Sequence, residues 1–195
     1  MSSTLFIGDV HACADELEQL LIQANADRVV LLGDVFNKGP KPEKTWALVQ
    51  EVGAESVLGN HDVRVIERAE AGTLLAPPEA VQWLKTLPLF ISGDGWVAVH
   101  GGIDPKRGVS GTRREQAVNM RRFPMGEPDA DFWWNQYSGE ALVIYGHDAS
   151  RGLQDHRPRT LGLDTGCVYG GRLTGYLLEA DRLISVPAQA TYRPL

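Results

Sequence analysis

The stretches LFIGDVH (residues 5–11) and VVLLGDVFNKGP (residues 29–40) decide which fold this sequence predicts. Each is an apolar run of strand length that passes directly into Gly-Asp, as in a buried strand with a functional carboxyl end. Residues 15–24 lie between the two stretches and place leucines on one face of a helix. The order strand, helix, strand is typical of an α/β sheet, whose ligand-binding crevice lies at the carboxyl ends of its strands.

The same alternation continues along the chain. Residues 42–52 predict a helix with a proline near its first turn, and residues 56–58 predict a third short strand. Further helices are expected at residues 63–71 and 79–87, and further strands at 89–92, 97–99, 142–145, 160–163, 173–178 and 183–186. Residues 103–140 are irregular and predict loops with a short helix over one face. We expect one α/β domain over residues 1–195.

The composition narrows the class of protein. The formal net charge is −6, which argues against a partner such as a nucleic acid duplex, because duplex binding needs a basic surface. The apolar runs are far shorter than the roughly 20 residues of a membrane span, so no membrane partner is expected. The start of the chain has neither the basic region nor the long apolar region of a secretory leader. We therefore expect a cytoplasmic protein.

Two cysteines, Cys13 and Cys167, have neither the spacing of a metal site nor that of a disulfide framework. This usage favours a reduced, intracellular protein. For Cys13 a buried thiol at the start of a helix is the favoured interpretation. A position beside a metal ion, two residues after His11, is the alternative.

Five short motifs combine glycine with residues that bind hard metal ions. They are GDVH (8–11), GDVFNKGP (33–40), GNHD (59–62), HGG (100–102) and GHD (146–148), and they contain four of the five histidines. Each motif alone has a simpler explanation, such as a turn, a helix cap or a buried histidine. Five in succession, each placed behind a predicted strand or turn, favour a site for two metal ions.

Six residues are the predicted metal ligands: Asp9, His11, Asp34, Asn60, His100 and His147. Asp9 and His11 are two residues apart, so both point the same way from an extended segment and can reach one ion. Asp34 has two carboxylate oxygens and can bridge two ions. Mixed carboxylate and imidazole ligation suits Mn, Fe or Zn better than Mg or Ca. Two such ions acidify a water molecule and clamp a phosphoryl group.

The remaining predicted site residues act on the substrate. His61 follows the ligand Asn60 and is expected to protonate the leaving oxygen, with Asp62 of the same motif completing the catalytic pair. Asn60 is also expected to contact the substrate. Lys38 is the first candidate for holding phosphate oxygens.

Either Arg121 or Arg122 is the second candidate for binding phosphate, although a solvated surface pair is the favoured interpretation of the two arginines. Trp133 and Trp134 favour a hydrophobic plug that anchors a loop, with stacking on an adenine as the alternative.

The five motifs, together with LDTGCVYGG (residues 163–171), resemble those of the calcineurin-like metallophosphoesterases, over about residues 5–171. The resemblance is greatest to the phosphoprotein phosphatase branch, and within it to the symmetrical diadenosine tetraphosphatases and the ApaH-like phosphatases. It implies a four-layer αββα sandwich with two mixed β-sheets. It also implies the metal-binding and acid roles assigned above.

Two positions bear on the substrate. Nucleases and phosphodiesterases of this superfamily usually have Gly-His-x-His at the last motif, whereas this chain has Ala149. Asn37 stands where the Ser/Thr phosphatases have an aspartate that pairs with the catalytic histidine. An amide orients the ring without stabilising its charge, so His61 should be a weak acid. We therefore expect good leaving groups, in phosphoanhydrides such as diadenosine tetraphosphate or polyphosphate.

Other functions remain open from the sequence. A protein Ser/Thr phosphatase, with a phosphoprotein as its substrate, would use the same chemistry on a more open crevice. A phospho-ligand binding module without activity would be expected to lack a metal ligand or the acid, and none of these residues is missing here.

Overall fold

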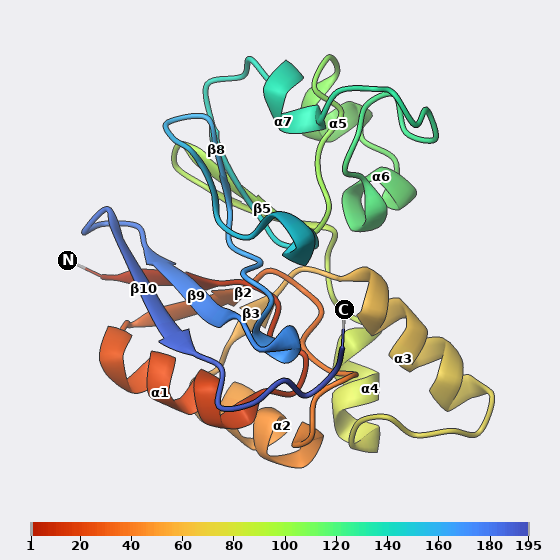
Figure 1. Ribbon diagram of the computed structural model, residues 1–195, viewed down its shortest axis with the longest axis vertical. Helices are drawn as coiled ribbons and strands as arrows, with labels where there is room; N and C mark the ends of the chain where they lie inside the picture. Colours follow the sequence, from red (N-terminus) through yellow and green to blue (C-terminus); the bar gives the residue numbers. More distant parts are fainter. Residues whose placement is uncertain (1, 195) are drawn as a thin grey trace.

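In the computed structural model, which describes residues 2–194, two five-stranded sheets lie face to face (Figure 1). The first sheet has the order β10 (Arg182–Pro187), β9 (Arg172–Leu177), β1 (Thr4–Ile7), β2 (Arg28–Leu31) and β3 (Glu55–Ser56). Strands β1, β2 and β3 are parallel, whereas β9 is antiparallel to both β1 and β10. The sheet is therefore mixed, and its three parallel strands all end at the same edge.

The second sheet has the same mixed character. Its order is β4 (Phe90–Gly93), β5 (Trp96–Val99), β6 (Leu142–Tyr145), β8 (Thr160–Gly162) and β7 (Gln154–His156). The central strands β5, β6 and β8 are parallel, and the edge strands β4 and β7 are antiparallel to their neighbours. The parallel strands again bring their carboxyl ends to one edge.

Helices cover the outer face of each sheet (Figure 1). Beside the first sheet are α1 (Ala14–Ala24), α2 (Pro42–Glu51), α3 (Asn60–Glu70) and α4 (Pro78–Leu84). Beside the second are the short helices α5 (Gly108–Gly111), α6 (Arg114–Asn119) and α7 (Trp133–Gln136). Two single turns, η1 (Ala149–Arg151) and η2 (Cys167–Tyr169), complete the elements. The expected four-layer αββα sandwich is confirmed.

The side chains between the two sheets form a core of their own. Phe6 and Val30 from the first sheet meet Trp96 and Ile144 from the second, and all four are buried. The rings of Phe6 and Trp96 meet edge to face, with their centroids 4.8 Å apart. Because these side chains are buried and packed together, they set the distance and angle at which the strand ends of one sheet face those of the other.

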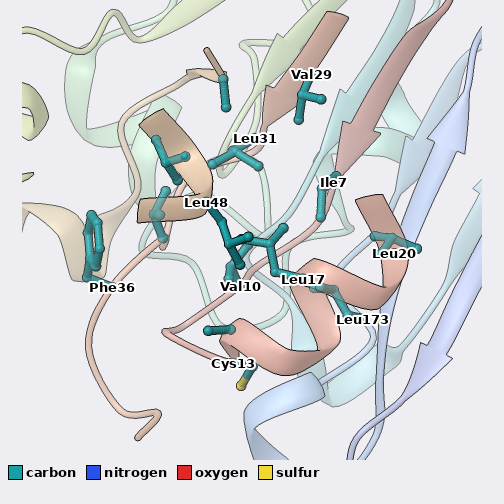
Figure 2. Packing of buried hydrophobic residues seen from close by; sticks show 14 of the residues in the cluster. Ile7, Val10, Cys13, Leu17, Leu20, Val29, Leu31, Phe36, Leu48 and Leu173 are labelled. Carbon is teal, nitrogen blue, oxygen red and sulfur yellow. The ribbon is translucent and has the colours of Figure 1, made fainter. Parts of the chain in front are cut away.

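A second core lies between the first sheet and α1 (Figure 2). Leu17 and Leu20 occupy one face of α1 and pack against the sheet residues Ile7 and Leu31. This is the face that the leucine spacing predicts. The packing holds the start of α1, and with it the turn that carries His11, rigidly against the sheet.

The expected elements are present with shifted boundaries. The helix expected from residue 63 begins at Asn60, so His61 and Asp62 lie on its first turn and not on an extended segment. Strand β7 was not predicted, because QDH has neither the apolar run nor the alternation of a strand. Within residues 2–194, no helix is long and apolar enough to cross a membrane. The single domain 1–195 includes Met1 and Leu195, which lie outside the described residues, and it stays a prediction.

Candidate metal centre

The loops that follow five strands converge on one pocket of about 180 Å³. The predicted ligands arrive from both sheets, after β1, β2 and β3 in the first and after β5 and β6 in the second. The pocket is lined by Asp9, His11, Asp34, Lys38, Asn60, His61, Arg121, His147, Ala149, Ser150, Asp164 and Tyr169. The sixth predicted ligand, His100, is fully buried beside Asp34.

Asp34 lies at the centre of the cluster. One of its carboxylate oxygens is 3.6 Å from Nε2 of His11, and the other is 3.5 Å from Nε2 of His100. Two groups of ligand atoms, each with all its members within 4.8 Å of one another, share this carboxylate. One group adds His11 and His61, and the other adds Asp9 and His100. A bridging position for Asp34 is therefore geometrically available.

A second point of convergence lies around Asn60. Nδ1 of His100 donates to the carbonyl of Leu32 over 2.7 Å, and Nε2 of His147 donates to the carbonyl of Asn119 over 3.0 Å. The other nitrogen of each ring therefore carries a lone pair, and these nitrogens lie 3.0 and 3.1 Å from Oδ1 of Asn60. Three electron-pair donors that face one another fit a cation better than they fit any hydrogen bond.

The backbone at these ligands is in an unusual conformation. Five of the eight non-glycine residues with positive φ among residues 2–194 belong to the motifs, and Ala12 directly follows the first one; the five are His11, Asp34, Asn37, Lys38 and His147. Left-handed backbone costs a side-chain-bearing residue on the order of 1 kcal/mol or more. Such strain gathered at one site is typical of functional loops, where the surrounding structure enforces a geometry that the chain would not adopt alone.

The glycines of the motifs provide close contact between loops. A Cβ atom at Gly59 would lie 2.2 Å from Oδ1 of Asp34, and one at Gly146 would lie 2.2 Å from Oδ1 of Asp9. Both positions therefore exclude any larger residue as long as the carboxylates stay in place. The Gly-Asn and Gly-His spacing thus has a steric origin in the neighbouring ligand.

Asp62 lies beneath the pocket and does not line it. Its buried carboxylate accepts hydrogen bonds from the backbone amides of Asp34, Val35 and Gly59, at 2.7, 3.0 and 3.1 Å. The side chain therefore ties the start of α3 to the turn that carries Asp34. This geometry supports a positioning role for Asp62, while its predicted role in a catalytic pair stays a prediction.

Burial shifts the pKa values of the ligands in opposite directions. It raises the pKa of Asp34 to about 7, and it raises the pKa of Asp9 well above the usual value, with help from the charges of Asp164 and Asp34. It lowers the pKa values of His11 and His147 well below the ordinary value for histidine. The imidazoles are thus neutral and able to bind a metal, and the crowded carboxylates lack a balancing positive charge. Divalent cations would supply that charge.

His61 points into the same pocket and is oriented by Asn37. Oδ1 of Asn37 accepts from the backbone amide of Lys38 at 2.8 Å, which turns Nδ2 toward Nδ1 of His61 at 3.1 Å. The amide donates to that ring nitrogen, so the proton of the neutral ring lies on Nε2. Burial and the charges of Lys38 and Arg64 lower the pKa of His61 to about 3. The imidazolium is therefore disfavoured, in the direction that the sequence predicts from Asn37.

The three candidate phosphate ligands differ in position. Nζ of Lys38 lies 2.5 Å from the hydroxyl of Tyr169 and 3.5 Å from Nε2 of His11, at the pocket wall. Arg121 also lines the pocket and donates to the carbonyl of His147 at 3.0 Å. Arg122 does not line it; its guanidinium donates to Ala130 instead. The structure thus separates two arginines that are adjacent in the sequence.

The tryptophans form the expected plug. Trp133 is fully buried and Trp134 nearly so, packed against Tyr145 on β6. Nε1 of Trp133 donates to the carbonyl of Gly101 at 3.0 Å, which anchors the turn that follows His100. Stacking on an adenine is excluded for a ring so deeply buried.

Sequence reasoning missed Asp164 as a site residue. It lies in the block LDTGCVYGG, lines the pocket and is nearly buried beside Asp9. Its place directly behind β8, another strand of the second sheet, is the signal that could have found it. The same block brings Cys167 close to Cys13 and Glu16, so the cysteines do meet in space despite their separation. Both thiols are buried, as favoured for Cys13.

Mixed sheets under helices, with Asp, Asn and His gathered at the strand ends, define a metallophosphoesterase. The chain belongs to the calcineurin-like phosphoesterase family, whose model matches residues 2–183. The protein is thus a hydrolase, and the family implies divalent metal ions.

Curated relatives of the chain carry the name of one enzyme within this family. The symmetrical bis(5'-nucleosyl)-tetraphosphatases of Aromatoleum aromaticum and Methylobacillus flagellatus are each 29% identical to the chain. The first comparison covers 93% of this chain and 96% of the relative, and the second covers 95% of each. The alignments run over 262 and 264 positions, so the relatives contain segments that have no counterpart in this chain of 195 residues.

Solved structures agree on the fold. A crystal structure described as a candidate diadenosine tetraphosphatase superposes with a TM-score of 0.88 at 31% identity, over 96% of this chain and 94% of that one. A protein serine/threonine phosphatase from Saccharomyces cerevisiae superposes with a TM-score of 0.58 at 15% identity, over 99% of this chain and 81% of that one. The second likeness concerns the fold alone.

Proposed function

We propose that the protein hydrolyses phosphoanhydrides, with dinucleoside tetraphosphates or inorganic polyphosphate as its substrates, at a site for two divalent ions. The observation that carries this proposal is the position of the Asp34 carboxylate, whose two oxygens lie 3.6 Å from Nε2 of His11 and 3.5 Å from Nε2 of His100. The relatives named as symmetrical tetraphosphatases support the same substrate class. When bound, the ions would acidify a water molecule and neutralise phosphoryl oxygens. The donor set suits Mn, Fe or Zn.

The side chains around the ions divide the remaining work. Asp9, His11, Asp34, Asn60, His100 and His147 are the proposed ligands. Lys38 and Arg121 both line the pocket and would hold phosphate oxygens there. Nε2–H of His61, held in that tautomer by Asn37, would donate a hydrogen bond to the leaving oxygen.

The pairing of His61 with an amide favours good leaving groups. A neutral imidazole donates a hydrogen bond but releases its proton reluctantly, so it assists a phosphate leaving group more effectively than a serine alkoxide. The low pKa of His61, about 3, supports this preference. A protein Ser/Thr phosphatase remains the second candidate, favoured only by the shared fold.

The test is a substrate panel with the manganese-loaded protein. Diadenosine tetraphosphate and polyphosphate are expected to turn over faster than a phosphoserine peptide. The variant His61→Asn is expected to lose about 100-fold in kcat or more while keeping its bound manganese, because the acid is not a ligand. A clear preference for the phosphopeptide would refute the proposal, as would an activity that survives complete chelation. A cytoplasmic location is proposed as well, and fractionation of expressing cells would test it.

A further inference from the structure

A second hollow adjoins the proposed metal centre. It has a volume of about 350 Å³ and lies between η1 and the segment that connects α6 to α7. Arg121 and Ser150 line both this hollow and the pocket of the metal centre, so the two spaces are contiguous. An extended substrate bound at the metal centre could therefore continue past Arg121 into this hollow.

Three arginines line this hollow, and each is already held in place. Nε of Arg121 and Nε of Arg151 lie 3.3 Å from the two carboxylate oxygens of Asp148, which is almost fully buried between them. Arg122 is held by the carbonyl of Ala130. Guanidinium groups that are ordered before binding lose less conformational entropy when a ligand arrives.

The ring of Phe132 fixes the far end of the hollow. The guanidinium carbon of Arg151 lies 3.9 Å from the ring centroid and that of Arg122 lies 4.4 Å from it. Trp134 stacks on the same ring at 4.6 Å, so the aromatic platform is anchored in the plug. The stacking orients both arginines and leaves the edges of their planar groups for hydrogen bonding.

The charges favour an anion with several phosphates. Two acidic residues, Asp148 and Glu127, line the hollow together with the three arginines. The carboxylate of Asp148 already forms ion pairs with Arg121 and Arg151. Within residues 2–194, the guanidinium of Arg151 has no polar partner besides Asp148, and its side chain is 41% exposed. A single phosphate bound at the metal centre would leave this charge unused.

We propose that this hollow is a second subsite, in which Arg151 and Arg122 bind the distal phosphates of a chain-like phosphoanhydride whose scissile phosphate lies at the metal centre. This rests on the proposed function and deepens it, because it makes chain length the basis of substrate choice. Arg121 stands at the junction of the two spaces and would contact the phosphates between the ends.

The test compares long and short substrates in the metal-loaded Arg151→Ala variant. KM for diadenosine tetraphosphate is expected to rise about three- to tenfold, with kcat changed less than about twofold, since an exposed charge-assisted contact is lost. KM for phenyl phosphate, which cannot reach the hollow, is expected to stay unchanged. Arg182→Ala, which removes an equal charge from the exposed start of β10, is the matched control and is expected to alter neither substrate.

A binding measurement separates this inference from the proposed function. Calorimetry with inorganic tetraphosphate on metal-loaded His61→Asn protein needs no turnover. Adding Arg151→Ala to that protein is expected to weaken tetraphosphate binding by about three- to tenfold as well. Unchanged affinity would overturn the subsite even if the chain hydrolyses phosphoanhydrides. A loss confined to a phosphoserine peptide would overturn it too, because the hollow would then serve peptide docking.

Discussion

At the scale of single residues, Asp34 illustrates how sequence pattern and burial act together. The residue ends a strand-to-turn stretch, has positive φ, and receives the backbone amide of His61 on Oδ1 at 2.7 Å. Its neighbours Asp9 and Asp164 are buried carboxylates as well, and burial raises the pKa of Asp164 to about 6. Without cations, the raised pKa values favour the protonated form of these carboxyl groups. Metal binding must therefore displace protons.

Metal affinity is therefore expected to depend on pH between about 6 and 8. A proton competes with the cation below the pKa of Asp34, about 7, so the affinity is full above that value and falls as the pH decreases through it. The three histidines proposed as ligands, whose pKa values are lowered, add no competing proton in this range. Calorimetry in two buffers of different ionisation enthalpy should detect about one or two protons released per chain at pH 6. A metal affinity that does not change between about pH 6 and 8 would contradict the expectation.

At the scale of elements, the start of α3 governs the metal centre. The helix begins at Asn60, so the proposed ligand Asn60, the proposed acid His61 and the buried Asp62 lie on one turn, and their side chains reach different partners. An argument from strand alternation cannot reproduce this divergence. The three backbone amides that Asp62 accepts belong to the helix start and to the Asp34 turn, which makes one carboxylate responsible for the relative position of two motifs.

Replacing Asp62 by asparagine should test that link. In Asp62→Asn, the side-chain NH2 group would face backbone N–H groups that the carboxylate now accepts from. The free energy of unfolding is therefore expected to fall by about 1–3 kcal/mol. Urea denaturation at about pH 8, above the pKa of about 7, compares the ionised carboxylate with the amide. Metal affinity should weaken as well. The exposed substitution Asp94→Asn in the β4–β5 turn is the control, and an equal effect of both changes would remove the special role of Asp62.

At the scale of the whole molecule, the site lies where the two sheets meet. Asp9, Asp34 and Asn60 follow strands of one sheet, and His100 and His147 follow strands of the other. The inter-sheet core of Phe6 and Trp96 sets the separation between the two groups of ligands. Metal ions that bind both groups would therefore tie the halves of the sandwich together.

Chelation should reveal this tie as a loss of stability. At free manganese about 100 times its Kd, binding to the folded state contributes about 2.7 kcal/mol, which for a chain of this size corresponds to a rise in Tm of about 5–10 °C. Thermal denaturation with manganese and with a chelator measures this difference. The variant Asp34→Asn should show a much smaller difference. An identical Tm in both conditions for the unaltered protein would contradict ligation across the sheets.

The sequence by itself determined the strand-and-helix order, the six proposed ligands and the orienting role of Asn37, because each depends on residue type at a short, fixed distance from a strand or motif. It could not place Asp164 in the site, separate Arg121 from Arg122, or bring Cys13 beside Cys167. Those outcomes depend on how the two sheets and their loops pack, and packing joins residues that no local pattern relates. The second hollow has the same origin, since η1 and the α6–α7 segment meet only in the folded chain.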